Sequence, residues 1–451
     1  MNPWGSIWNT VTQGNNRSVT VKKNIIGSFL LKGISILVSL LLVPATIGYV
    51  NAELYGVWMA LASTMTWLAF ADIGFTQGLK NKLTEAIAKD DWARGKSLVS
   101  TTYFMMFLIF IPVCALLEFL VPLVDWASLL NVNGRYSDDI TRVMHVLVAL
   151  ACLQMVVNVL VSVIAAFQKV ALSNSFLVIG NILSLGIIYI LRAICPPSLM
   201  ALVFSLASMP VLVTMIATFI LFNGKFKNVS PSLKSVNKGY IKDLFNLGYK
   251  FFIINIQVLV LYQSTNILIA NVSSPTEVTH YNIAYKLMNC AMMVYTIITA
   301  PLWPAYTDAY AREDYDWMKR MRKKMEKILL LSIGGCVLLT ALSQPIYDIW
   351  VGDAVSIPFT MTALVAIYVV IFCWATLNGT LIVGMGKIRL NTYVVVAGML
   401  THIPLAMMLS NKLGCYGVIL SMSLINLVYG IVYQIQVSKL LNKTAEGVWN
   451  Q

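Results

Sequence analysis

Two lysine side chains lie inside long apolar stretches of the sequence, where a charged group is costly. Lys32 lies within the apolar stretch 25–50, and Lys286 lies within the stretch 279–304. An ammonium group in a membrane-spanning helix costs about 2.5–3.5 kcal/mol or more, so it usually faces a partner or a water-filled cavity. Because both groups are cationic, the chemistry that they predict is the binding of an anion.

Each lysine belongs to a stripe of polar side chains at helical spacing. The face around Lys32 holds Ser28, Ser35, Ser39 and Thr46. The face around Lys286 holds Asn282, Asn289, Met293 and Thr296. Serine and asparagine stripes also join helices in membranes, and a lysine can extend its ammonium group to the membrane surface. Helix packing alone, however, does not require a cation.

Asp72 is a third charged group within an apolar stretch. It lies at about the same depth as Lys32, in the next predicted helix. An ion pair between the two groups would offset the cost of burying each of them. Asp72 and Lys32 are therefore a candidate ion pair or gate. On this interpretation Lys32 is a substrate contact, a structural partner of Asp72, or a switch whose pairing changes with substrate.

The stretch 255–266 is unusually polar for a membrane span. Its polar side chains that share roughly one side are Asn255, Tyr262, Gln263 and Asn266. Amides and hydroxyls suit the hydroxyl groups of sugars, and the aromatic rings that could stack on sugar faces are Trp58, Trp67, Tyr281 and Tyr285. Aromatic residues are also common in packing and at membrane interfaces. The predicted substrate-binding set combines the four polar residues with Lys32, Lys286, Asn282 and Asn289.

The high hydrophobic content and the long apolar stretches indicate that membrane-spanning helices position these residues. The 451 residues are 58% hydrophobic and 11% charged, against about 45–50% and about 25% in soluble domains. About 20 apolar residues form one membrane-spanning helix, and twelve such stretches are present, at 25–49, 54–79, 98–122, 142–166, 171–193, 199–222, 246–270, 279–304, 327–348, 358–383, 392–410 and 415–438. Backbone groups in lipid must bond within their own segment. We therefore predict an all-α polytopic membrane protein with twelve transmembrane helices.

The net charge of +13 is explained by where the basic residues lie. Numbered from a cytoplasmic N-terminus, the tails and even-numbered gaps hold 26 of the 32 lysines and arginines, and the opposite side holds four. This asymmetry follows the positive-inside rule and predicts that both termini are cytoplasmic. Because this asymmetry accounts for the positive net charge, we do not predict a nucleic-acid partner. The basic segment 312–327 suits anionic membrane lipids, or it serves only to fix the topology.

The spans divide into two halves of six. The predicted organisation is a cytoplasmic tail at 1–24, a six-helix bundle at 25–222, a cytoplasmic linker at 223–245, a second six-helix bundle at 246–438 and a tail at 439–451. Because six is even, both halves enter the membrane from the same side, as in a parallel repeat.

Catalytic chemistry has little support in the sequence. The seven cysteines are scattered without metal-ligand spacing, and the chain has three histidines. No phosphate-binding loop, metalloprotease pair or nucleophile elbow is present. We therefore expect no catalytic residue, no metal site and no cofactor, and we do not expect an enzyme.

Three segments resemble a known family. The segment 41–63 reads LLVPATIGYVNAELYGVWMALAS and resembles the first-to-second-span signature of polysaccharide-repeat flippases. The segments 70–91 and 266–289, FADIGFTQGLKNKLTEAIAKDD and NILIANVSSPTEVTHYNIAYKLMN, are similar to the loop after span two and to the connection of spans seven and eight. The family is that of the O-antigen and exopolysaccharide flippases (Wzx-like), within the multidrug/oligosaccharidyl-lipid/polysaccharide exporter superfamily.

The resemblance implies a fold and a site. It implies two six-helix bundles that form a V around a central cavity lined by spans 1, 2, 7 and 8. In related flippases, cations in spans 1 and 8 are associated with the pyrophosphate of the lipid carrier, and Lys32 and Lys286 occupy matching positions. Many relatives carry an acid where Asn266 stands, so a role of this position in ion coupling is in doubt. The lipid II flippase has two further spans, which this chain lacks.

The predicted function is therefore transport. We expect a flippase in the bacterial inner membrane that moves undecaprenyl-diphosphate-linked oligosaccharide from the cytoplasmic to the outer leaflet by alternating access. The sequence leaves open a coupling ion, Na⁺ or H⁺, and polysaccharide-assembly proteins as partners. One alternative is an ion-coupled multidrug extruder of the same fold. A membrane glycan polymerase or ligase is a second, although the longest external segment, about 123–141, is short for such an enzyme.

Overall fold

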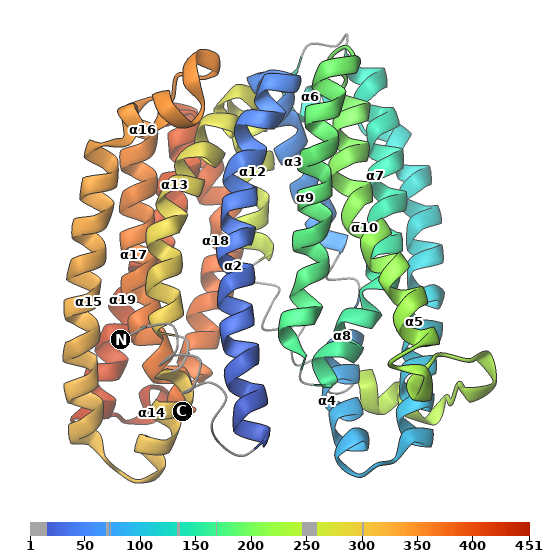
Figure 1. Ribbon diagram of the computed structural model, residues 1–451. Coiled ribbons are helices and arrows are strands. Elements are labelled where there is room, and N and C mark those ends of the chain that lie inside the picture. The colour runs from blue at the N-terminus through green and yellow to red at the C-terminus, as the bar shows by residue number, and fades with distance from the viewer. Residues whose placement is uncertain are drawn as a thin grey trace, which may run out of the picture. The chain divides into compact units, whose positions relative to one another are not determined.

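The computed structural model describes residues 16–68, 72, 74–132, 136–167, 169–245, 259–299 and 302–451 (Figure 1). Throughout these residues the chain is built from helices and their connections, and no strand occurs among them. The prediction of an all-α membrane protein is confirmed. Its physical reason is that apolar stretches of this length can satisfy their backbone hydrogen bonds within each helix.

In the described part of the chain, eight helices are long and apolar enough to cross a membrane. The number is up to nine if the bent pair α15 (Tyr315–Ala341) and α16 (Ser343–Trp350), which meet at 63°, forms one span. Two other predicted spans fall short of this test: α3 (Ala52–Leu68) has only 17 residues, and α13 (Pro275–Thr299) carries several polar side chains. The predicted span 246–270 lies largely outside the described residues. The count of twelve therefore stays a prediction.

The chain forms two compact units. The first comprises 1–50, 65–126 and 135–256, and the second comprises 51–64, 127–134 and 257–451. The predicted halves met at 223–245, so two segments from the first half, 51–64 and 127–134, belong here to the second unit. Hydrogen bonds explain part of this assignment, since the amides of Asn271 and Asn131 donate to the backbone oxygens of Leu129 and Ser273.

The first unit is a bundle of long helices. Its main elements are α2 (Asn16–Tyr49), α4 (Phe75–Ala88), α5 (Trp92–Leu120), α7 (Ser137–Val157), α8 (Val159–Ala166), α9 (Val170–Ile194) and α10 (Leu199–Asn223). The helix α9 packs against both α2 and α10, and α7 packs against α5 and α10. At the crossing of α9 and α10, a Cβ on Gly180 would lie 2.6 Å from the Cα of Pro210, so only glycine allows this approach.

The second unit is arranged around α17, which packs against α13, α15 and α19 (Figure 1). Its elements are α3 (Ala52–Leu68, mostly in this unit), the π-helix η6 (Leu259–Gln263), α12 (Ser264–Val272), α13 (Pro275–Thr299), α14 (Leu302–Ala311), α15 (Tyr315–Ala341), α16 (Ser343–Trp350), α17 (Phe359–Gly384), α18 (Arg389–Leu413) and α19 (Cys415–Leu441). A glycine again allows close packing, because the Trp374 ring lies against Gly430, where a Cβ would be 2.3 Å from the ring.

Large apolar side chains cover the outside of the long helices. Phe219 on α10, Ile194 at the end of α9 and Leu331 on α15 are each more than 70% exposed. A water-soluble protein seldom exposes so large an apolar area. An exposed apolar surface of this kind suits contact with lipid.

Candidate functional site

Lys286 is positioned by α13, whose first turn is fixed by local contacts. Pro275 begins the helix, and the hydroxyl of Ser274 accepts a hydrogen bond from the backbone N–H of Glu277. A proline at the first position and a serine before it are typical of a helix start. Eleven residues, or about 16 Å of helix at ~1.5 Å per residue, separate Pro275 from Lys286.

The helix α3 lies directly against the start of α13. The hydroxyl of Thr279 donates to the backbone oxygen of Ala52 over 2.5 Å. A Cβ on Gly56 would lie 1.7 Å from the backbone oxygen of Pro275, so the two backbones approach as closely as glycine permits. This contact brings the Tyr-Gly-x-Trp segment of α3 beside the polar face of α13.

Lys286 donates a hydrogen bond to the hydroxyl of Tyr55, with 3.4 Å between Nζ and the oxygen. The lysine side chain is half-buried, whereas Tyr55 is almost fully buried. The structure therefore holds the ammonium group at a defined position on the polar face of α13. The Tyr55 hydroxyl is a neutral hydrogen-bond partner of this ammonium group.

Two of the predicted binding residues form hydrogen bonds between helices. The amide of Asn282 donates to the side-chain oxygen of Asn266 over 2.9 Å and to the backbone oxygen of Val278 over 2.8 Å. The amide of Asn266 donates in turn to the hydroxyl of Ser63 over 2.7 Å. Both asparagines are buried. This chain of bonds joins α3, α12 and α13, as the packing interpretation of an asparagine stripe expects.

Gln263 and Asn289 differ from these buried amides. Both are half-buried, and neither side chain forms a hydrogen bond within the described part of the chain. Tyr262 is also half-buried, and its hydroxyl donates to the side-chain oxygen of Asn426 over 3.5 Å. Tyr262 and Gln263 close the π-helix η6, a kind of segment that often occurs at functional sites. These side chains retain hydrogen-bonding groups for a ligand.

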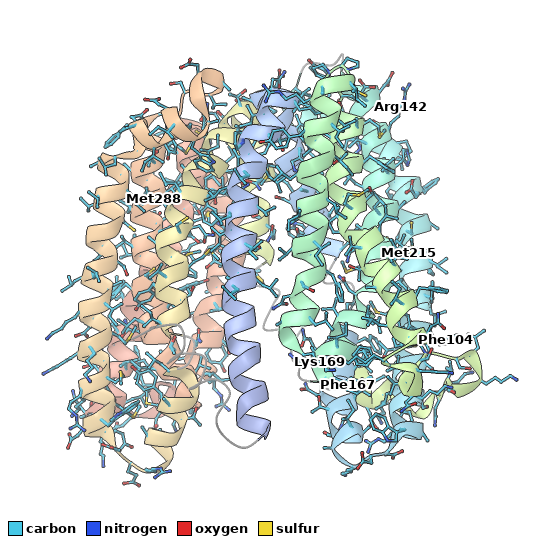
Figure 2. All side chains as sticks on the ribbon, viewed as in Figure 1. Phe104, Arg142, Phe167, Lys169, Met215 and Met288 are labelled. Carbon is cyan, nitrogen blue, oxygen red and sulfur yellow. The ribbon has the colours of Figure 1, made fainter. Side chains whose placement is uncertain are left out.

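Aromatic rings form a continuous cluster beside these residues. Tyr281 and Tyr285 stack with 5.8 Å between ring centroids, and Tyr285 lies 6.5 Å from Tyr368. Phe372 lies 6.2 Å from Tyr368 and 6.1 Å from Tyr262. The cluster therefore extends from α13 through α17 to η6. Figure 2 labels Met288 of α13, which lies two residues after Lys286 in the sequence.

The predicted residues of the first unit are arranged differently. Lys32 on α2 is exposed. The carboxylate of Asp72 accepts hydrogen bonds from the backbone N–H and the hydroxyl of Thr76, at the start of α4. A carboxylate at this position also interacts favourably with the helix dipole. Among the described residues no ion pair joins Asp72 to Lys32, and their pairing stays a prediction. Asn255 lies outside the described residues.

Sequence reasoning missed three residues that the structure brings to the site: Tyr55, Ser63 and Tyr368. Tyr55 lies in the Tyr-Gly-x-Trp segment, whose glycine was the available signal of a close backbone contact. Ser63 and Tyr368 gave no comparable signal, because serine and tyrosine are frequent in any membrane helix. Within the described residues, no group of three or more His, Cys, Asp or Glu side chains could hold a metal ion.

A family model described as "Polysaccharide biosynthesis protein" matches residues 21–310. The chain belongs to this family. The match includes α2, α3, α12 and α13, so it covers both predicted lysines and most of the site. The family assignment agrees with the resemblance to polysaccharide flippases. A search of curated proteins gives no match.

Solved structures with a similar fold are transporters. One is the inward-facing conformation of a multidrug resistance MATE family transporter of the MOP superfamily, with a TM-score of 0.71 at 13% identity, covering 91% of this chain and 96% of that one. The outward-facing conformation of such a transporter has a TM-score of 0.59 at 15% identity, covering 96% and 98%. MATE in the straight conformation has a TM-score of 0.61 at 14% identity, also covering 96% and 98%.

These identities establish the fold but not the substrate. The family and the fold together show that the chain is a multi-pass membrane transporter of the flippase or exporter type. The choice between a lipid-linked saccharide and a drug depends on the chemistry of the site.

Proposed function

We propose that this protein is a flippase for undecaprenyl-diphosphate-linked oligosaccharide repeat units, of the O-antigen or a related polysaccharide. It would move them from the cytoplasmic to the outer leaflet of the bacterial inner membrane by alternating access, with both of its termini in the cytoplasm. The observation that carries the proposal is the Lys286 ammonium group, held by Tyr55 beside amides and aromatic rings. A cation next to sugar-binding chemistry matches a ligand that joins a diphosphate to saccharides.

Lys286 would bind the diphosphate. A hydrogen bond between charged groups contributes about 1.5–3 kcal/mol, roughly twice as much as one between neutral groups. The Tyr55 hydroxyl would orient the ammonium group. The prenyl chain would stay in the lipid.

Gln263, Asn289 and Tyr262 would bind the saccharide. Their amide and hydroxyl groups are half-buried, and those of Gln263 and Asn289 are not bonded to other described residues. The stacked rings of Tyr281 and Tyr285 would complete this surface. We propose that Asn266 and Asn282 contribute chiefly by holding α3, α12 and α13 together, and Asn255 remains a proposed ligand by its position in the sequence.

Lys32 would supply a second cation from the first unit. Its exposure leaves its ammonium group able to bind an anion. The carboxylate of Asp72 is the alternative partner, once Thr76 releases it. We propose that Lys32 acts as a switch between these two partners, whereas Lys286 contacts the substrate directly.

The second candidate is an ion-coupled multidrug extruder. The solved structures of similar fold include multidrug resistance transporters, which favours it. A lysine held in the polar face of α13 opposes it, because a cation repels cationic drugs. Coupling to Na⁺ or H⁺ is compatible with both candidates. We propose transport rather than glycan polymerisation or ligation, and polysaccharide-assembly proteins would then act on the translocated product.

Complementation of a flippase-deleted strain tests the proposal. We expect Lys286→Ala to lower surface polysaccharide about tenfold or more, as the loss of one charge-assisted contact implies. Lys286→Arg should retain part of the function, and Lys32→Ala should have a smaller effect. The matched control is Lys324→Ala, which removes an exposed lysine of α15.

The proposal fails if Lys286→Ala and Lys32→Ala, singly and combined, restore full surface polysaccharide at normal protein levels. A drug-susceptibility assay on the same strains separates the two candidates. If the wild-type protein protects against cationic drugs but does not restore polysaccharide, the extruder is correct.

A further inference from the structure

Two lysines lie close together in the first unit, since the Nζ of Lys169 lies over the ring of Phe226 and Lys225 is the residue before Phe226. Lys169 directly precedes α9 and is half-buried, and Lys225 is exposed in the turn that follows α10. Contact with the Lys225 side chain, together with partial burial, lowers the pKa of Lys169 to about 8. Two ammonium groups this close repel each other unless a negative charge lies between them. The folded chain therefore concentrates positive charge at this point.

Carboxylates do not offset this charge. Ion pairs in the described residues join other lysines and arginines to glutamates, and none includes Lys169 or Lys225. The start of α9 adds positive potential, because its first N–H groups have no side-chain acceptor from the Lys169 cap position. Among the described residues, then, no carboxylate lies within ion-pair distance of either lysine.

Aromatic rings line the pair on one side. The Nζ of Lys169 lies 5.8 Å from the ring centroid of Phe226, which packs against Phe167 at 4.7 Å. Phe167 stacks on Trp92 at 6.3 Å, and Trp92 is 37% exposed. Figure 2 shows Lys169 beside Phe167, near α8 and α4. Exposed tryptophan next to lysine is typical of the headgroup level of a membrane.

We propose that Lys169 and Lys225 bind the phosphate of an anionic lipid headgroup. The phosphate would lie between the two ammonium groups, and the rings of Trp92 and Phe167 would contact the glycerol and ester region below it. Free phosphate shares the same charge chemistry. A lipid fits better because both lysines lie in turns that directly adjoin the apolar helices α9 and α10. This site uses neither Lys32 nor Lys286, so it is independent of the proposed transport function.

Lipid retention by the purified full-length protein tests the site. The protein is placed in phosphatidylcholine nanodiscs with increasing phosphatidylglycerol, and the lipids that remain bound are counted by native mass spectrometry. We expect Lys169→Gln and Lys225→Gln each to lower phosphatidylglycerol retention about fivefold. Lys169→Arg should retain binding, and Lys227→Gln, which removes an exposed lysine of the same linker, should change it less than about twofold.

Two results would overturn the proposal. The proposal is wrong if the Lys169→Gln/Lys225→Gln protein retains phosphatidylglycerol like the wild type, or if Lys227→Gln lowers the retention as much as the site variants do. Either result would mean that diffuse surface charge, rather than this lysine pair, holds the lipid. If inorganic phosphate or pyrophosphate displaces the lipid and protects the protein against heat as strongly, the site takes a soluble anion. Thermal melting of each variant in phosphatidylcholine alone verifies that the variants are folded.

Discussion

Lysine, glutamine and asparagine side chains of similar sequence context have different partners in this protein. Lys286 is held by a tyrosine hydroxyl, Asn266 and Asn282 bond to each other, and Gln263 keeps its amide for a ligand. Helical phase alone placed these residues on polar faces. Helical phase could not distinguish residues that bond within the protein from residues left for a ligand, because it does not specify which neighbouring helix supplies a hydrogen-bond partner.

Asn266 and Gln263 provide a direct comparison of packing and binding. Asn266→Ala removes the bonds to Ser63 and Asn282. It should lower the free energy of unfolding by about 0.6 to 1.7 kcal/mol, the range for bonds between membrane helices. Gln263→Ala should change that energy by less than about 0.5 kcal/mol but reduce transport.

Denaturant unfolding and surface-polysaccharide assays on both variants provide the measurements. If Asn266→Ala leaves stability unchanged and abolishes transport, this asparagine is a ligand rather than a helix contact.

Asp72 and Thr76 should be coupled in energy. Their hydrogen bonds at the start of α4 predict that Asp72→Ala costs about 0.5–2 kcal/mol of stability, as at other helix caps. A double-mutant cycle with Thr76→Ala should then give an interaction energy above about 0.5 kcal/mol. The matched double-mutant cycle of Asp72→Ala with Lys32→Ala should give an interaction energy near zero in the protein without substrate. A large Asp72–Lys32 coupling would instead support the ion pair.

At the scale of the element, α3 illustrates how a short helix can define a site. It has 17 residues, yet it supplies Tyr55 to Lys286 and Ser63 to Asn266. Its first turns meet the start of α13 at Ala52, which accepts a hydrogen bond from Thr279, and at Gly56, whose backbone lies against Pro275. The sequence predicted a membrane helix here from its apolar content, but not its role in joining the second unit.

Gly56→Ala should disrupt this contact. The new methyl group would lie 1.7 Å from the backbone oxygen of Pro275, which cannot move as a flexible side chain would. We expect a loss of about 3 kcal/mol or more, as for severe overpacking, with a fall in transport because Tyr55 leaves Lys286. The matched control is Gly335→Ala in α15, where nothing lies within 4 Å.

The control should be neutral or should stabilise the helix by about 0.5–1 kcal/mol, as glycine-to-alanine changes do in helix interiors. Thermal melting of the purified proteins measures both changes. Equal melting temperatures for the two variants would show that α3 does not approach α13 in this way.

At the scale of the whole molecule, the distribution of charge predicts which side of the membrane each loop faces. Cys195 lies between α9 and α10 in a gap predicted to be external, and it is an exposed free cysteine. A maleimide that cannot cross membranes should therefore label Cys195 in intact spheroplasts. Cys195→Ser should abolish most of the labelling, since Cys152, Cys336, Cys373 and Cys415 are buried. Labelling only after the membrane is opened would reverse the predicted topology.

The sequence by itself determined the class of fold and predicted the polar faces with their two lysines, because apolar length and helical phase are local properties of the chain. The tertiary structure decided which polar groups are used within the protein. It assigned Tyr55 to Lys286 and joined Asn266 to Asn282 and Ser63. These outcomes depend on close approach between segments distant in the chain, as at Gly56 and Pro275. Local periodicity carries no information about such approaches.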